Sequence, residues 1–191
     1  MLTIDIQLLG TTAMLHHKFE AEAENPKATR NVVVDHGTPR EQAEKVVYRD
    51  DNGLFYFPSS WITGSIREAG SNHKLRGSRK STKFVVPAAI RVVSPDIPLL
   101  NGDGKSRIKD YEVDSRPVTI PATKGRIMRH RPRFDCWSAK FPLVINDDLL
   151  PEEFVQQLLT EAGQSQGIGD FRPNTRGPFG CFRVVSWAKA K

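Results

Sequence analysis

Glycines and arginines are concentrated in one short stretch late in the chain, and together these residue types can hold a phosphate group. The stretch is GIGDFRPNTRGPFG, residues 167–180, and it leads directly into the segment CFRVV. Glycine is favoured where the backbone needs a positive φ or comes close to another atom, and main-chain amides in such a loop can reach an anion. Arginine adds charge-assisted, often bidentate, contacts to phosphate. The residues predicted to bind a polyanion here are Gly167, Gly169, Arg172, Arg176, Gly177 and Gly180. The alternative, that the glycines only form a tight turn before the last strand, stays open.

Cationic residues gather in two stretches without any acid, residues 69–95 and 116–134. The formal net charge of the whole chain is +6 and its pI is about 9.5. The two stretches together carry about twice that net charge, so the rest of the chain is acidic overall. Such segregation is typical of nucleic-acid binding, although a solvated face or an acidic protein partner is the alternative. The basic residues predicted to contact nucleic acid are Lys74, Arg76, Arg79, Lys80, Lys83, Lys124, Arg126, Arg129, Arg131 and Arg133.

Few residues favour catalysis or metal binding. Asp35 and His36 in VVVDHGTP can do acid–base work, with a turn aspartate beside a solvated histidine as the alternative. His16 and His17 are adjacent, so their side chains diverge and seldom bind one ion together. We therefore assign no metal, no cofactor and no catalytic residue.

The two cysteines, Cys136 and Cys181, are too few for a disulfide framework and are predicted to be buried thiols. No apolar run reaches membrane-spanning length, so we expect a cytoplasmic protein without a membrane partner.

Helices and strands must position these residues. The segment LTIDIQLLG alternates as a strand does, and DDNG between two β-rich runs predicts a hairpin. The run containing Pro87 predicts a strand pair or a bent edge strand.

Three helix starts are also predicted. Thr38 can cap a short helix, with proline at its first position and Glu41 at its third. Ser59 or Ser60 can cap a helix near residues 59–72, where hydroxyls and free amides favour an anion. Asp147 or Asp148 can cap a helix near residues 148–162, which Gly163 would end.

This order of elements predicts an α+β fold with a ferredoxin-like, RRM-like βαββαβ core and an antiparallel sheet. We expect a single domain over residues 1–191, with a basic β-hairpin insertion over residues 101–134. The helices would cover one face of the sheet, leaving the other face open to a ligand, as in RNA-recognition folds.

Two stretches resemble the RAMP superfamily, the RRM-like backbone subunits of CRISPR effector complexes. The glycine-rich loop before the last strand is one. The other is VVYRDDNGLFYFPSSWITGSIREA, whose matching positions are Arg49, Asp50, Gly53, Tyr56, Pro58, Ser59, Ser60, Gly64 and Arg67. The basic insertion is similar in kind to the family's protruding thumb.

The resemblance implies a protein that polymerises along a guide RNA, each subunit holding a few nucleotides while its thumb interrupts base pairing. It adds Gly64 and Arg67 to the predicted nucleic-acid contacts. Some family members cleave target RNA with a loop aspartate. The comparable place here holds Glu44, a third weak catalytic candidate.

The function predicted is a non-enzymatic RNA-binding subunit that self-associates into a filament, with single-stranded DNA as an alternative target and other effector subunits as partners. One alternative is a metal-independent endoribonuclease of the same fold that uses His36 or one of the His16–His17 pair. Two further alternatives are a phage or plasmid protein that binds single-stranded nucleic acid and a module that binds an acidic protein.

Overall fold

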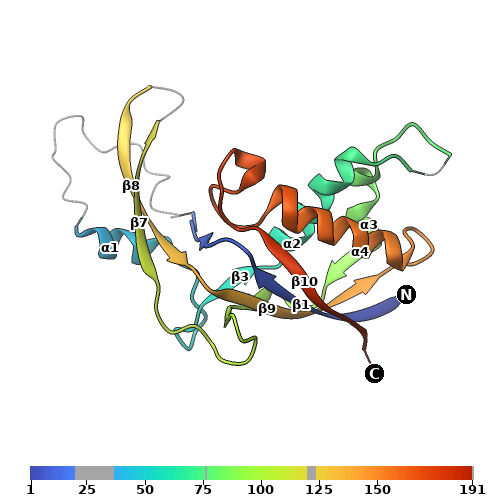
Figure 1. The fold of residues 1–191 in the computed structure, drawn as a ribbon, viewed down its shortest axis with the longest axis horizontal. Helices are drawn as coiled ribbons and strands as arrows, with labels where there is room; N and C mark the ends of the chain where they lie inside the picture. Colours follow the sequence, from blue (N-terminus) through green and yellow to red (C-terminus); the bar gives the residue numbers. More distant parts are fainter. Residues whose placement is uncertain (20–36, 76, 120–123, 191) are drawn as a thin grey trace.

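The computed structural model describes residues 1–19, 37–75, 77–119 and 124–190, which form antiparallel sheets and helices (Figure 1). The strands are β1 (Leu2–Gly10), β2 (Met14–Leu15), β3 (Tyr56–Pro58), β4 (Ile90–Val92), β5 (Asp96–Pro98), β6 (Leu100–Asn101), β7 (Glu112–Thr119), β8 (Arg126–Phe134), β9 (Trp137–Ile145) and β10 (Phe182–Lys189). The α-helices are α1 (Pro39–Lys45), α2 (Ser60–Ala69), α3 (Val86–Ala89) and α4 (Glu152–Glu161). Shorter helical turns are η2 (Gly70–Asn72), η3 (Thr82–Phe84), η4 (Ala162–Gln166) and η5 (Pro173–Thr175).

The main sheet is antiparallel and has the strand order β10-β1-β9-β4, with β6 also paired to β9. Helices α2 and α4 cover one of its faces (Figure 1). The alternation predicted for β1 is confirmed, because Ile4, Ile6 and Leu8 are buried. The fold is therefore the mixed, antiparallel α+β arrangement expected from the sequence.

Helix α2 buries Ile62, Ile66 and Ala69 completely, as the helical spacing predicts. Helix α4 exists as expected, but both of its predicted ends are wrong. Its N-cap is Pro151 rather than an aspartate, and the chain runs past Gly163 through the π-helical turn η4. A side chain at Gly163 would collide with the carbonyl of Phe182, so this glycine lets β10 approach the turn closely.

Three further local predictions need correction. Pro87 lies in the first turn of α3 instead of interrupting a strand, a position where its missing N–H costs nothing. The DDNG turn forms, but the hairpin is short. Its flanks share the bridge Arg49↔Phe55 and main-chain hydrogen bonds from the Asp50 amide to the Leu54 carbonyl and from the Tyr56 amide to the Tyr48 carbonyl, and β3 otherwise pairs with β5. Cys136 is exposed and Cys181 half-buried, so neither is a buried thiol.

Strands β7 and β8 form a long hairpin that projects from the main sheet (Figure 1). Its register runs from Glu112↔Arg133 to Thr119↔Arg126, and β2 extends it through Met14↔Phe134. Helix α1 packs against the hairpin and has the predicted capping box at Thr38. Within the described residues, no helix is long and apolar enough to cross a membrane.

Candidate nucleic-acid interface

The glycine-rich loop is fastened to the strand β2 and its approach. The Gly180 amide donates to the Ala13 carbonyl at 2.7 Å, and the Asp170 amide donates to the Leu15 carbonyl at 2.9 Å. Gly169 has φ +80°, and a Cβ there would lie 2.6 Å from the Leu15 oxygen. The loop thus fills a space between β2 and the helices, where a side chain at residue 169 does not fit.

Contacts within the protein account for glycine at several of these positions. Side chains at Gly177 and Gly180 would collide with the carbonyls of Phe171 and Ile168, so the atoms that approach these backbones belong to the protein. Most main-chain amides from Gly167 to Cys181 already donate to protein acceptors. A minority of the loop amides, together with the side chains, is left for any contact with a polyanion.

The two loop arginines play different parts. Arg172 is half-buried and donates through Nη1 to the Gly169 carbonyl at 2.8 Å, which ties the loop to itself. Arg176 is exposed at φ +65° and has no ion pair among the described residues. Arg176 is thus the loop cation that is available to a ligand.

The start of α2 lies beside this loop, because the Trp61 ring is 3.4 Å from a Cβ built at Gly169. Ser59 occupies the N-cap position, but its side chain makes no capping bond, and Ser60 is exposed. A groove of about 410 Å³ follows the helix, lined by Ser59, Ser60, Thr63, Gly64, Arg67, Pro87, Ile90, Arg91 and Val92. The structure thus brings together the serine pair, Gly64 and Arg67.

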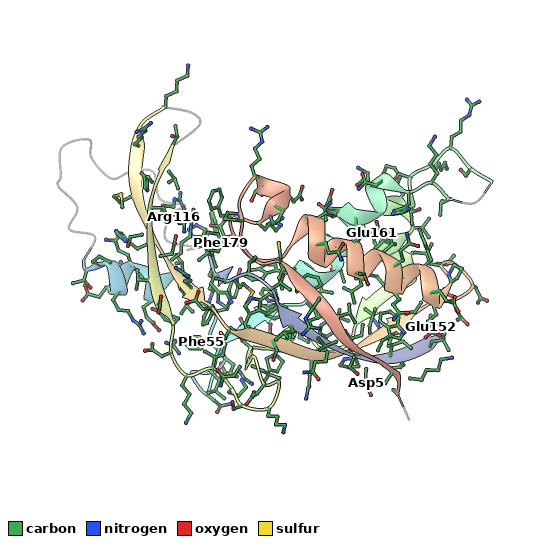
Figure 2. The ribbon with its side chains drawn as sticks, viewed as in Figure 1. Asp5, Phe55, Arg116, Glu152, Glu161 and Phe179 are labelled. Atoms are coloured by element: carbon green, nitrogen blue, oxygen red, sulfur yellow. The ribbon has the colours of Figure 1, made fainter. Side chains whose placement is uncertain are left out.

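Much of the positive charge of the β7–β8 hairpin is neutralised locally. Arg131 lies 2.9 Å from Asp170 in the glycine-rich loop, with only 8% of its side chain exposed. Arg116 pairs with Asp114 at 2.8 Å, and Arg133 pairs with Asp135 at 2.6 Å. Both acids lie just outside the acid-free stretch 116–134. Arg116 also lies over the Phe179 ring at 4.6 Å, and Figure 2 labels both residues. The hairpin cations without an ion pair in the described chain are Lys124, Arg126 and Arg129.

The described cations of the other acid-free stretch, residues 69–95, are not neutralised in this way. Lys74, Arg79 and Lys80 are exposed and Lys83 is half-buried, and the described chain gives none of them an ion pair. Arg76 lies outside the described residues. Figure 1 shows this segment and the hairpin at opposite ends of the long axis, with the η5 turn between them on the same side. The two cationic stretches therefore form separate surfaces rather than one patch.

The uncovered face of the sheet lacks the features of a base-stacking surface. A shallow depression of about 460 Å³ on the sheet is bordered by Asp5, Gln7, Lys140, Pro142 and Ser186, among others. The aromatic residues Phe141 and Trp187 pair with Ile6 and share its face, toward the helices. Across the described strands β1, β4, β9 and β10, no aromatic ring points outward, so the features of this structure do not favour stacking in the manner of an RNA-recognition sheet.

The catalytic candidates are poorly placed. Asp35 and His36 lie outside the described residues. Glu44 accepts hydrogen bonds from Arg49 and from the Tyr111 hydroxyl at 2.6 Å, and the Arg49 contact lowers the pKa of this carboxyl. His16 is fully buried, and burial lowers its pKa to about 3. Glu44 is thus a structural anion, and His16 stays neutral inside the core.

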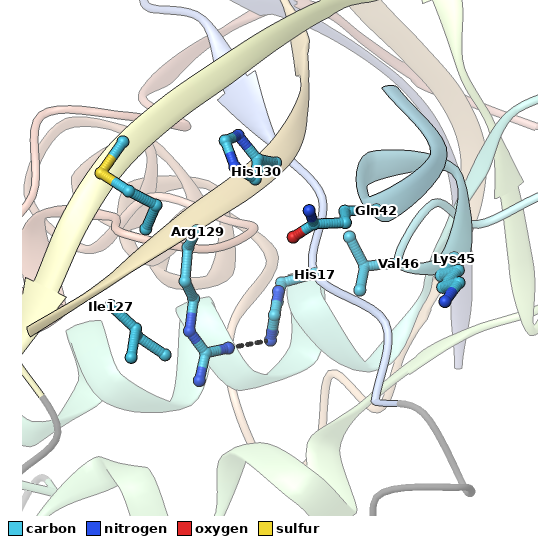
Figure 3. Close-up of a pocket in the computed structure, with 8 residues that line it drawn as sticks. His17, Gln42, Lys45, Val46, Ile127, Arg129 and His130 are labelled. Carbon is cyan, nitrogen blue, oxygen red and sulfur yellow. Dashed lines mark hydrogen bonds between the residues drawn. The ribbon is translucent and has the colours of Figure 1, made fainter. Parts of the chain in front are cut away.

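His17 lies in a pocket of about 530 Å³ between α1 and β8 (Figure 3). His130, Arg129 and Lys45 line the same pocket, and Arg129 lies 2.8 Å from Nε2 of His17. Imidazoles and cations in one open pocket are suited to acid–base chemistry on a phosphodiester. Among the described residues, no three His, Cys, Asp or Glu side chains are placed to hold a metal ion.

No protein-family model and no curated protein matches the chain. The fold does match solved structures. One is a chain in the cryo-EM structure of the Type III-B Cmr-beta bound to cognate target RNA, with TM-score 0.60 and 13% identity over 100% of this chain. This chain spans 61% of the length of that one. A chain of a Type IV-B CRISPR complex aligns over 98% of this chain and 90% of its own length, with TM-score 0.49 and 9% identity.

Sequence reasoning missed the histidine pocket and the neutralised hairpin. His17 and His130 are far apart in the chain, and the pairing of β2 with β8 brings them to one pocket. Asp114 and Asp135 were visible in the sequence, immediately outside the segment searched for acids. Testing pairs two residues apart along the expected strands would have found them, because such side chains share one face.

Proposed function

We propose that the chain is an RNA-binding subunit of a CRISPR-type ribonucleoprotein that holds single-stranded or guide RNA on its helix side. The observation that carries this proposal is the free positive charge on that side. Three projecting elements supply it: the hairpin with Lys124 and Arg126, the η5 turn with Arg176, and the segment that carries Lys74, Arg79 and Lys80. The fold it shares with a chain of an RNA-bound Cmr complex supports the proposal.

The strand order supports a ferredoxin-like core within this proposal. In chain order, β1, α2, β4, β9, α4 and β10 give βαββαβ, and the sheet order β10-β1-β9-β4 is then 4-1-3-2. The hairpin enters between the second and third of these strands, so residues 101–134 would be a thumb-like insertion in a single domain.

The interface residues would divide into two groups. The exposed cations and the groove with Ser60 and Arg91 would contact phosphates, since these groups point to solvent. Arg67 lines the same groove but is ion-paired with Glu68 at 2.9 Å, so a phosphate there would have to compete with that carboxylate. The glycines and Arg131 would shape the loop and fix the hairpin against it. Self-association along the RNA and contacts with other effector subunits belong to the same proposal.

Fluorescence anisotropy with a labelled single-stranded RNA over a range of salt concentrations tests this function. Each phosphate contact steepens the plot of log affinity against log salt by about 0.7 for a single strand. We expect tight binding at low salt and a slope equivalent to several contacts. A protein that ignores RNA in dilute buffer contradicts the proposal. The length distribution of co-purified nucleic acid separates a guide-bound subunit from a phage or plasmid single-strand binder.

A metal-independent endoribonuclease is the second candidate, favoured by the pocket that contains His17 and His130. A neutral imidazole would take the proton of a ribose 2′-hydroxyl, whose oxygen attacks phosphorus, while an imidazolium protonates the departing 5′-oxygen. The products are a 2′,3′-cyclic phosphate and a free 5′-hydroxyl. Cleavage of labelled RNA in chelator that is lost in His17→Ala and in His130→Ala would support it. Cleavage that is lost only in His36→Ala would assign the reaction to His36 instead of the pocket.

A further inference from the structure

Phe84 is an exposed aromatic residue that directly follows Lys83 and lies close in the chain to Lys74, Arg79 and Lys80, cations without an ion pair in the described chain. Its side chain is 70% exposed. The Lys83 ammonium lies 5.4 Å from the centre of the ring. A single exposed apolar residue is ordinary on a protein surface, so its surroundings decide whether this ring has a role.

The backbone that carries Phe84 is firmly held. Thr82, two residues before Phe84, anchors this backbone: it is fully buried, and its amide donates to the His73 carbonyl at 2.9 Å. Ser81 caps η3 and donates its hydroxyl to the Gly70 carbonyl at 3.0 Å, and Phe84 donates its amide to the Ser81 carbonyl at 3.3 Å. The exposure of the ring therefore results from an ordered turn whose geometry points the side chain outward.

The segment before it is a small hairpin of cations. Lys74 bridges to Ser81, and the Leu75 amide donates to the Lys80 carbonyl at 3.0 Å. This pairing places Lys74 and Lys80 near η3, and no acid of the described chain pairs with either. Nearby acids are already engaged: Glu161 lies 2.6 Å from His73.

We propose that Phe84 stacks on an unpaired base while the flanking lysines hold the adjoining phosphates. A single strand alternates flat bases with charged phosphates, and an aromatic ring beside several free cations matches that alternation. The abundance of lysine favours nucleic acid over a protein partner, because protein interfaces are depleted in lysine. This inference rests on the proposed RNA binding and adds a second contact surface, at the opposite end of the molecule from the hairpin.

The test measures the affinity of the full chain for fluorescein-labelled oligouridine in Phe84→Leu, Phe84→Trp and the control Val93→Ala. Val93 is 55% exposed and lies outside the cationic hairpin. We expect leucine to weaken binding by about 5- to 150-fold, the range that loss of one base–aromatic stack produces. Tryptophan and the Val93 variant should bind as the parent does. Because Phe84 carries no charge, its loss should leave the salt slope unchanged, whereas Lys80→Ala should lower it by about 0.7.

A spectroscopic readout reports stacking directly. The fluorescence of the Phe84→Trp variant, corrected for the parent's three tryptophans, should be quenched when oligouridine binds. Parent-like affinity in Phe84→Leu, together with no quenching of the tryptophan introduced by Phe84→Trp, overturns the inference while leaving RNA binding intact. If the parent itself does not bind oligouridine, the proposed function fails and this inference fails with it. If the Phe84 variants change only the sedimentation of the protein, the ring belongs to a protein interface and the inference is overturned.

Discussion

Replacing Gly169 by alanine tests whether the glycine-rich loop is shaped by protein packing or by a ligand. Alanine at φ +80° costs about 1–2 kcal/mol of backbone strain. The added methyl group would also lie 2.6 Å from the Leu15 carbonyl oxygen, so the loop and β2 must separate. Their separation weakens the hydrogen bond from the Asp170 amide, worth about 1 kcal/mol, and displaces packed neighbours at a cost of about 1 kcal/mol or more. Gly169→Ala should therefore lower the free energy of unfolding by about 3–4 kcal/mol.

Gly53→Ala is the matched control for backbone strain. Gly53 has φ +74°, and in the described chain no atom beyond its two neighbours in sequence would lie within 4 Å of a Cβ at this position. Gly53→Ala should lower the free energy of unfolding by only about 1–2 kcal/mol. For a chain of this size, 1 kcal/mol shifts Tm by about 2–4 °C, so Gly169→Ala should melt about 4–8 °C below Gly53→Ala. Urea denaturation gives the free energies and calorimetry gives Tm. Equal stability of the two variants, with RNA affinity lost only in Gly169→Ala, would refute the packing argument and restore the loop backbone as a ligand contact.

Three further predictions concern charge. Arg126→Ala should lower the salt slope of RNA binding by about 0.7, whereas Arg133→Ala should leave it unchanged because Asp135 already pairs with that arginine; equal slopes would contradict the role given to the hairpin. Arg176→Glu should weaken RNA binding without changing Tm, since its side chain is exposed, and a lower Tm would make it a structural residue. The folded-state pKa of Glu44 is lowered by Arg49, so its contribution to stability is present above the unfolded pKa of about 4.3 and is lost as pH falls. Urea titrations should then show a smaller acid-induced loss of stability in Glu44→Gln, by about 1 kcal/mol or less because the pair is partly exposed; an unchanged pH profile would contradict this.

Local patterns predicted the elements well where the cause was local. The capping box of α1 depends on Thr38 and Glu41, three residues apart, and it formed as expected. The buried face of α2 follows from helical spacing alone. The ends of α4 were wrong because the sequence offered several adequate caps, and contact with β10 determined how far the helix continues.

The sequence by itself determined the alternation of β1, the helical faces and the totals of charge, because these depend on residues a few positions apart or on composition. Tertiary structure alone decided which charges are paired between distant segments and what approaches the glycines. Arg131 is neutralised by Asp170, and Gly169 is crowded by Leu15. The physical reason is distance: ion pairing and steric contact act over a few ångströms, and only the folded chain brings segments so remote in sequence to that range.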